Sequence, residues 1–158
     1  WQTSVVDGLR KLSEYAMTKN INILCENHGW LSSNPEQLML AINTVNLPNC
    51  GTLPDFGNWC LERINKDDIW GDCAKEYPDK YQGVKLMMPA AKANSATPYD
   101  FEEGGNETSI KYTKMMRIVR EGGYQGYIGV EYEGDTMDEM TGITATRDLL
   151  IKVYNLTN

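Results

Sequence analysis

Patterns typical of amphipathic helices and of buried strands alternate along the whole chain. Val5, Leu9 and Leu12 have the spacing of one helix face, and the apolar run 21–25 that follows suits a buried strand. The same alternation predicts further strands at 50–53, 92–96 and 127–132, and further helices at 35–45, 81–88, 115–119 and 143–153. Because strands that alternate with helices pair in parallel through right-handed crossovers, we expect an α/β fold.

The spacing of the predicted strand ends narrows this α/β fold to one architecture. Glu26, Asp55, Ser95 and Glu131 lie at the ends of successive strands, at intervals of 29, 40 and 36 residues. These intervals are close to the roughly 31 residues per unit of an eight-unit barrel of about 250 residues. One helix followed by four strand–helix units therefore predicts half of a (β/α)8 TIM barrel, which we expect to occupy residues 1–158 as one domain.

Two polar stretches interrupt the alternation. Residues 56–79 are polar and aromatic with little periodicity, and we expect a long loop with at most one helical turn. Residues 97–109 predict a second, acidic loop. The run Ser33–Glu36 has capping-box spacing with proline in the first turn, which predicts a helix start at Ser33. Cys60 and Cys73 flank a polar segment and could pair in an oxidising compartment.

Composition excludes several classes of partner and location. The chain of 158 residues carries 22 acidic against 15 basic residues, for a net charge of −7. A nucleic-acid backbone is therefore not an expected partner, because phosphates need clustered Lys and Arg. No apolar run approaches the roughly 20 residues of a membrane span. No signal-peptide pattern follows Trp1, so a cytoplasmic location is favoured over a periplasmic or secreted one. The first residue is Trp1 and not methionine, which indicates processing or a longer parent protein.

Three acidic residues close three of the four predicted strands. Glu26, Asp55 and Glu131 each follow a short apolar run, and the carboxyl ends of barrel strands surround the active site. Three carboxylates that converge there repel one another unless a cation or another partner meets them. Oxygen ligands suit Mg²⁺ or Mn²⁺. The alternative is that each acid only caps the next helix or ends its strand.

The segments that contain these acids resemble a known family. Ile23–Gly29 (ILCENHG), Gly51–Asn58 (GTLPDFGN) and Tyr127–Gly134 (YIGVEYEG) are similar to the sugar phosphate isomerase/epimerase family of xylose-isomerase-like TIM barrels. The resemblance spans nearly the whole chain and corresponds to strands five to eight of such a barrel, its C-terminal half.

The resemblance implies a divalent metal, Mn²⁺, Mg²⁺ or Co²⁺, bound by Glu, Asp, His and Glu at four strand ends. Glu26, Asp55 and Glu131 match three of these ligands, whereas the position of the histidine falls at Ser95. A hydroxyl is a poor replacement for imidazole. Related subfamilies also carry a lysine where Thr97 stands, so this chain departs from the family pattern at two neighbouring positions.

The resemblance also implies a reaction. The metal would polarise a ketose carbonyl, and Glu26 and Glu131 would act as base and acid on the neighbouring C–H bond, in a sugar or sugar phosphate isomerase or epimerase. The carbohydrate substrate is expected to contact residues near these strand ends or able to bind an anion, namely His28, Trp30, Asn58, Lys92 and Glu133.

Alternatives on the same scaffold stay open at this point. One is a lyase or dehydratase acting on keto-sugars, and another is a catalytically inactive barrel that binds carbohydrate, suggested by Ser95 and Thr97. An endonuclease is disfavoured by the net charge of −7. Four parallel strands leave two open edges, so we expect a partner, either the N-terminal half of the barrel or further copies of the chain.

Overall fold

The computed structural model describes residues 2–68 and 71–157. Its helices are α1 (Gln2–Met17), α2 (Pro35–Val45), α3 (Lys80–Met87), α4 (Tyr112–Glu121) and α5 (Glu139–Thr157), with short 3₁₀ helices η1 (Trp30–Ser33) and η2 (Met88–Ala90). Its strands are β1 (Ile23–Glu26), β2 (Cys50–Leu53), β3 (Cys60–Arg63), β4 (Cys73–Glu76), β5 (Asn94–Ala96) and β6 (Ile128–Val130). None of the described helices is long and apolar enough to cross a membrane.

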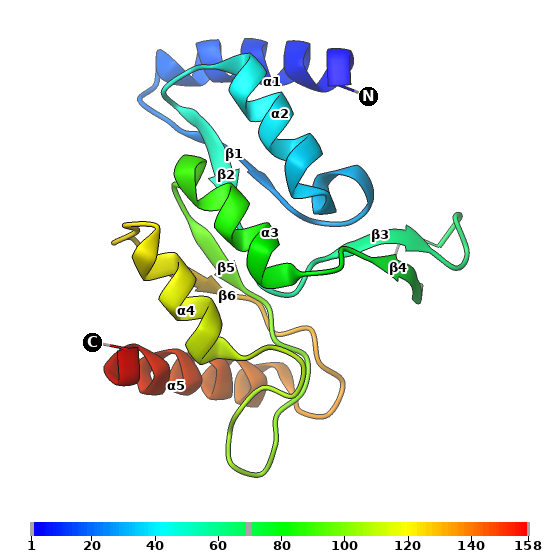
Figure 1. Cartoon of the computed structure of the whole chain (residues 1–158), viewed down its shortest axis with the longest axis vertical. Coiled ribbons are helices and arrows are strands. Elements are labelled where there is room, and N and C mark those ends of the chain that lie inside the picture. The colour runs from blue at the N-terminus through cyan, green and yellow to red at the C-terminus, as the bar shows by residue number, and fades with distance from the viewer. Residues whose placement is uncertain (1, 69–70, 158) are drawn as a thin grey trace.

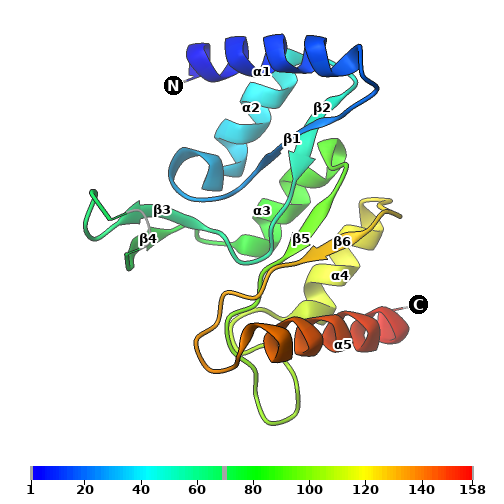
Figure 2. The same ribbon diagram turned by 180° about the vertical axis from the view of Figure 1, so that it is seen from behind.

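Four of the strands run parallel and side by side. β1 pairs with β2, and β5 pairs with β6, both in parallel. Two isolated parallel bridges, Thr52↔Ala91 and Asp55↔Ser95, connect the two pairs into the order β1-β2-β5-β6. Figures 1 and 2 show these strands as one curved series. Within the described residues the series does not close, so the fold is a partial (β/α)8 barrel, as the alternation predicts.

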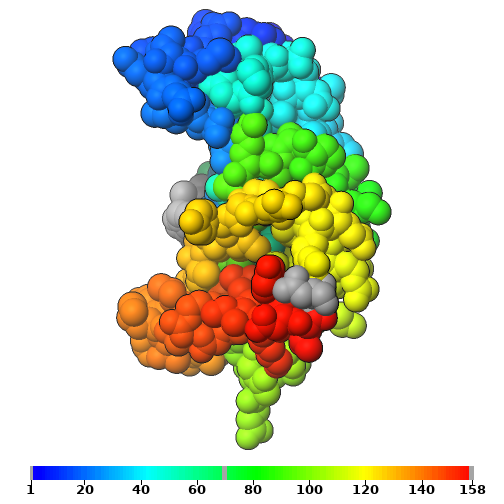
Figure 3. Space-filling view, turned by 90° about the vertical axis from the view of Figure 1, so that its left-hand side faces the viewer, coloured from blue at the N-terminus to red at the C-terminus, as the bar shows by residue number. Residues whose placement is uncertain are grey.

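The helices cover only one face of these strands. In Figure 1, α2, α3 and α4 lie in front of the strands, and in Figure 2 the strands lie in front of the helices. The core between the two layers is fully buried and contains Val45, Val84, Met87, Met115 and Val119. In contrast, all four residues of β1 are only half-buried. Helices α1 and α5 lie at opposite ends of the molecule (Figure 3).

The start of α2 differs by one residue from the predicted capping box. The N-cap is Asn34, whose side chain accepts a hydrogen bond from the backbone N–H of Gln37. Ser33 instead accepts a hydrogen bond from the backbone N–H of Gly29 and donates one to the carbonyl of Asn58. The predicted cap was wrong because Ser33 has a long-range partner, which local sequence spacing cannot reveal.

The long polar stretch after β2 is not the predicted loop. Within it, β3 and β4 form an antiparallel hairpin that extends away from the body of the molecule (Figure 1). A disulfide between Cys60 and Cys73 closes this hairpin, with the two Cα atoms 5.7 Å apart. Its strands contribute little to the core, because only Cys60 is buried. A hairpin with so few buried side chains lacks the alternating apolar pattern by which strands are recognised.

Candidate functional site

Three carboxylates meet at the carboxyl ends of the parallel strands. Glu26 is the last residue of β1, Asp55 follows β2 by two residues, and Glu131 directly follows β6. We call Glu26, Asp55 and Glu131 the strand-end carboxylates. The negative charges of Asp55 and Glu131 both raise the pKa of Glu26. The structure therefore brings the three predicted acids within electrostatic reach of one another.

Glu26 is the strand-end carboxylate that is best suited to exchange a proton. Burial, together with the charges of Asp55 and Glu131, raises its pKa to about 7, against the opposing effect of His28. Its Oε1 atom is shielded from solvent and has no hydrogen-bond partner among the described residues. A carboxyl group with such a pKa is partly protonated at neutral pH, as a general acid–base requires.

Asp55 is held on all sides by the chain itself. It is completely buried. Its Oδ1 accepts the backbone N–H groups of Gly57 at 2.8 Å and Asn58 at 2.7 Å, and its Oδ2 accepts the Thr97 hydroxyl at 2.5 Å. Burial raises the pKa of Asp55 to about 6, although these three hydrogen bonds favour the charged form. Both carboxylate oxygens are thus already engaged.

Glu131 is hydrogen-bonded to Ser95, the residue at the position where the family resemblance places a histidine. The buried Ser95 hydroxyl donates a hydrogen bond of 2.9 Å to Glu131 Oε1. The strands β5 and β6 pair in register at Ser95 and Gly129, which places this hydroxyl beside the end of β6. Ser95 therefore serves as a hydrogen-bond donor to a strand-end carboxylate.

The strand-end carboxylates do not fit a metal centre as the chain arranges them. Their chemistry suits a hard divalent cation, since all the donors are oxygen atoms. However, no group of three or more His, Cys, Asp or Glu residues in the described part of the chain lies close enough to hold a metal ion. Asp55 would have to give up its hydroxyl partner Thr97 and two backbone N–H groups to become a ligand.

Asn27 is a central residue of the site that sequence reasoning missed. It is completely buried, and its Nδ2 donates to the carbonyls of Asp55 and Asn58, both at 3.0 Å. Its Oδ1 accepts the backbone N–H of Asp55 at 2.7 Å. Asn27 thereby fastens the end of β1 to the segment that follows β2. Its place next to Glu26 in the sequence was the one available signal.

Three predicted substrate contacts lie at the same end as the carboxylates. His28 acts electrostatically on Glu26 and on Glu133. Glu133 follows β6, its backbone N–H donates to the carbonyl of Pro98, and burial raises its pKa against the effect of nearby His28 and Arg63. Asn58 is half-buried, and its Nδ2 is shielded from solvent with no partner among the residues described.

The two other predicted substrate contacts are Trp30 and Lys92, and they lie at opposite ends of the strands. Trp30 is 47% exposed, with φ of +51°, just after the end of β1. Lys92 lies before β5, and its backbone N–H bonds to the carbonyl of Thr52. Its side chain runs beside Gly51, near the start of β2. The structure therefore places Lys92 towards the amino ends of the strands, away from the strand-end carboxylates.

Arg63 is a cation near the site for which the sequence offered no signal. It lies in β3, where its guanidinium donates to the carbonyl of Gly71 at 2.8 Å. Its charge acts on Glu133 and on Tyr99, whose hydroxyl donates to the carbonyl of Gly57. The disulfide-closed hairpin thus brings a positive charge towards an otherwise acidic region.

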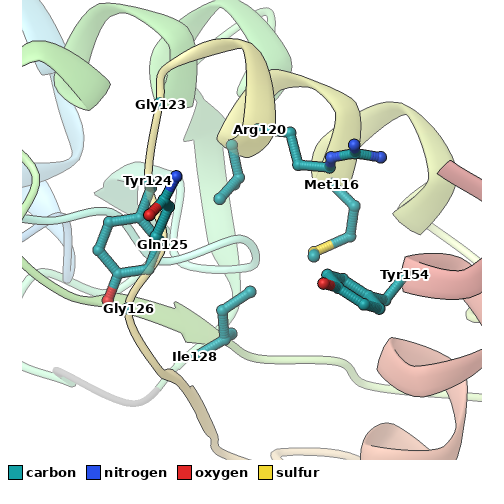
Figure 4. Close-up of a pocket in the computed structure, with 9 residues that line it drawn as sticks. Met116, Arg120, Gly123, Tyr124, Gln125, Gly126, Ile128 and Tyr154 are labelled. Carbon is teal, nitrogen blue, oxygen red and sulfur yellow. The ribbon is translucent and has the colours of Figure 1, made fainter. Parts of the chain in front are cut away.

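A cavity of about 620 Å³ lies elsewhere in the molecule. Figure 4 shows it between α4, the segment before β6, and α5, with Met116, Arg120, Ile128 and Tyr154 around it. Ile128 is the first residue of β6, at the opposite end of that strand from Glu131. None of the candidate site residues lines this cavity.

Comparison with known proteins identifies the family. Residues 1–153 match the model of the xylose isomerase-like TIM barrel family. The chain belongs to this family, which is largely made up of enzymes. This confirms both the resemblance and the predicted fold class.

Two individual relatives illustrate the extent of the similarity. The C-glycoside deglycosidase alpha subunit of Arthrobacter globiformis is 33% identical over 70 residues, which are 44% of this chain and 20% of the subunit. The crystal structure of a xylose isomerase-like TIM barrel protein from Mycobacterium smegmatis in complex with magnesium has a TM-score of 0.69 at 18% identity. That match covers 99% of this chain and 52% of the other, so the chain spans about half the length of its solved relative.

Proposed function

We propose that this chain forms part of a carbohydrate isomerase or epimerase that moves a proton next to a carbonyl group. The observation that carries the proposal is Glu26, a half-buried carboxyl group with its pKa raised to about 7 and an unpartnered Oε1 among the described atoms. Efficient general acid–base groups have pKa values near the working pH. Membership of the xylose isomerase-like TIM barrel family supports the substrate class.

In the proposed reaction Glu26 acts as the base. Its ionised carboxylate takes the proton from the carbon next to the carbonyl, the C–H electron pair forms a C=C bond, and the carbonyl oxygen becomes an enolate oxygen. In epimerisation a proton is then added to the other face of the same carbon. In isomerisation a proton is added to the former carbonyl carbon, while the proton of the neighbouring hydroxyl passes to the enolate oxygen, so that the carbonyl group moves by one carbon. Glu131, held through its Oε1 by Ser95, is the second group that can deliver a proton.

The family resemblance also implies a divalent metal, which the proposed reaction does not use. The magnesium in the structure of the Mycobacterium smegmatis relative supports a divalent ion for that protein. In this chain Asp55 already accepts three hydrogen bonds from other groups, and no step of the proposed mechanism depends on a metal.

Hydrogen exchange with solvent tests the proposal directly. The protein is incubated in D₂O with D-fructose, D-psicose and D-fructose 6-phosphate, and deuterium at the carbon next to the carbonyl is followed by NMR. We expect exchange with at least one sugar, and Glu26→Gln should reduce its rate by at least about 100-fold. Glu14→Gln, at an exposed position of α1, is the matched control. Exchange in none of these sugars, or undiminished exchange in Glu26→Gln, rejects the proposal.

A lyase or deglycosidase reaction is the second candidate, and one comparison favours it. The Arthrobacter globiformis relative is a C-glycoside deglycosidase subunit. Elimination from a keto-sugar would begin with the same removal of a proton by Glu26. The NMR experiment separates the two candidates, since elimination yields an unsaturated or cleaved product. A barrel that only binds carbohydrate would show sugar binding without exchange.

A further inference from the structure

The hydroxyls of Ser95 and Thr97 stabilise two of the strand-end carboxylates by hydrogen bonds, as a bound cation would by its charge. Thr97 donates to Asp55 Oδ2, and Ser95 donates to Glu131 Oε1. All three of Asp55, Ser95 and Thr97 are essentially inaccessible to solvent. Neutral hydroxyl donors at both places stabilise the carboxylates without an added positive charge. Because each hydroxyl already donates its one proton to a carboxylate, neither can donate to a reacting carbonyl oxygen, and a different donor would have to stabilise negative charge there.

Asn58 carries an unpartnered donor at this end of the strands. Its Nδ2 is shielded from solvent and is not hydrogen-bonded to any described residue. A buried N–H donor without a partner is uncommon and calls for an explanation, such as a ligand that completes its hydrogen bond. Glu26 Oε1 presents the complementary case, a shielded acceptor that is likewise unpartnered within the described chain.

The backbone of Asn58 is fixed from three directions. Its N–H donates to Asp55 Oδ1 at 2.7 Å, and its carbonyl accepts Asn27 Nδ2 at 3.0 Å and Ser33 Oγ at 2.9 Å. These partners lie just after β1, just after β2 and in η1, and the three segments are tied together at this point. The main chain of Asn58 is therefore fixed, so that its side chain starts from a defined position when charge develops on a nearby oxygen, as a donor in an oxyanion hole requires.

We propose that the side-chain amide of Asn58 is the electrophile of this site: Nδ2 donates a hydrogen bond to the carbonyl oxygen of the carbohydrate while Glu26 takes up the neighbouring proton, so that the reaction proceeds without a metal ion. This inference rests on the proposed function. When the C–H bond breaks, the negative charge on the enolate oxygen is stabilised by the Asn58 N–H, and the proton resides on Glu26. Asn58 is then a catalytic residue.

Variants of Asn58 test the amide. Asn58→Asp keeps the size of the side chain and removes the Nδ2 donor, so we expect kcat for deuterium exchange to fall by about 100-fold or more, while KM changes by less than about threefold. Asn43→Asp adds the same charge at an exposed position of α2 and should leave kcat unchanged. Thermal unfolding of both variants shows whether they are folded. Wild-type kcat in folded Asn58→Asp overturns the inference.

A metal titration tests the second half of the inference independently of activity. EDTA-dialysed protein is titrated with Mn²⁺, and free Mn²⁺ is measured by electron paramagnetic resonance. We expect no saturable binding below about 1 mM. Micromolar binding that is lost in Glu131→Gln overturns metal independence even if exchange occurs. If the wild-type protein exchanges no hydrogen, the proposed function fails, and the titration still decides whether the carboxylates hold a metal.

Discussion

Each strand-end carboxylate takes its properties from its immediate neighbours. Asp55 has three hydrogen-bond donors and is fixed in place, whereas Glu131 has the hydroxyl of Ser95. Burial is the largest cause of the raised pKa of Glu26, about 7, and of the raised pKa of Asp55, about 6. The three residues share a position at strand ends, yet their surroundings assign them different chemical roles.

Glu26 should make the stability of the protein depend on pH. Its folded-state pKa of about 7 lies above the ordinary 4.5, so folding disfavours the charged form, and the wild type loses stability as pH rises from about 4.5 to 7. Glu26→Gln removes this loss. We expect the Tm of Glu26→Gln to equal that of the wild type at pH 4 and to exceed it by about 2–4 °C at pH 8. The exposed Glu14→Gln should show no such difference, and a lower Tm for Glu26→Gln at pH 8 contradicts the assignment.

Asn27 should matter for stability as well as for the site. Asn27→Ala removes three hydrogen bonds. It leaves the carbonyl and the backbone N–H of Asp55 without their side-chain partner, and the Asn58 carbonyl with Ser33 Oγ alone. We expect a loss of about 2–3 kcal/mol in the free energy of unfolding, measured by urea denaturation. Asn43→Ala, at an exposed position, should cost less than about 0.5 kcal/mol. Equal effects of the two substitutions would show that the buried network contributes nothing.

The sequence could reveal the site only in part. Glu26, Asp55 and Glu131 were recognisable because each ends an apolar run, and parallel strands bring such positions together. The partners of these acids were not recognisable, because the contacts of Asn27 and Thr97 join residues 28 and 42 positions apart. Nothing local in the sequence indicates which hydroxyl or amide will complete them.

At the scale of elements, the β3–β4 hairpin depends on its disulfide. Only Cys60 of its two strands is buried, so little apolar surface holds the hairpin together. A cross-link between residues 13 positions apart is worth about 3 kcal/mol in the chain-entropy treatment. We expect dithiothreitol to lower the Tm of the wild type and to have no further effect on a Cys60→Ala/Cys73→Ala variant. An unchanged Tm after verified reduction contradicts this.

The same disulfide indicates the kind of cellular compartment in which the protein works. Disulfides form and persist in oxidising compartments. We propose that the chain works in such a compartment, in place of the cytoplasmic location that the sequence favoured. Labelling of free thiols in freshly isolated protein checks this: two reactive cysteines after denaturation, Cys25 and Cys50, support it, and four contradict it.

Two helical glycines should respond to alanine in opposite ways. In α3, a Cβ on Gly83 would lie 2.3 Å from the ring of the buried Trp59, so Gly83→Ala should destabilise the protein by about 1–3 kcal/mol. In α1, a Cβ on Gly8 would meet no described atom within 4 Å. Gly8→Ala should stabilise by about 0.5–1 kcal/mol, because alanine favours the helix. Urea denaturation measures both, and destabilisation of similar size at the two positions contradicts the packing argument.

Elements with a buried face were predictable, and the hairpin was not. The helix at Lys80–Met87 and the strand at Cys50–Leu53 follow the apolar residues that they bury. The hairpin is held by backbone pairing and one disulfide outside the main core. A pattern of buried side chains therefore carries no information about it.

At the scale of the whole molecule, the partial barrel leaves β1 and β6 each with one unpaired edge in the described structure. Large apolar side chains beside these edges are exposed, with Ile21 at 55% and Tyr127 at 95%. We propose that another set of strand–helix units, from an N-terminal half or a second copy, covers this surface. The alternation of elements predicted the barrel class, and the described strands leave the series open.

Hydrodynamics and dye binding check the open surface. We expect residues 1–158 to elute from a size-exclusion column as an oligomer or to bind the hydrophobic dye ANS strongly. Tyr127→Lys/Ile21→Lys, which charges both edges, should reduce either effect, whereas Lys66→Glu at the exposed turn of the hairpin should not. A monomer that binds no dye contradicts the proposal.

The Cys60–Cys73 disulfide joins residues only 13 positions apart, so it should hold the chain together when a protease cuts between them. Residues 64–68, between the two hairpin strands, are exposed, and both flanks of any cut there are joined covalently. Nicked molecules would migrate at full length on a non-reducing gel and separate into two fragments only after reduction. Damage at the outermost part of the molecule would thus leave the chain in one piece.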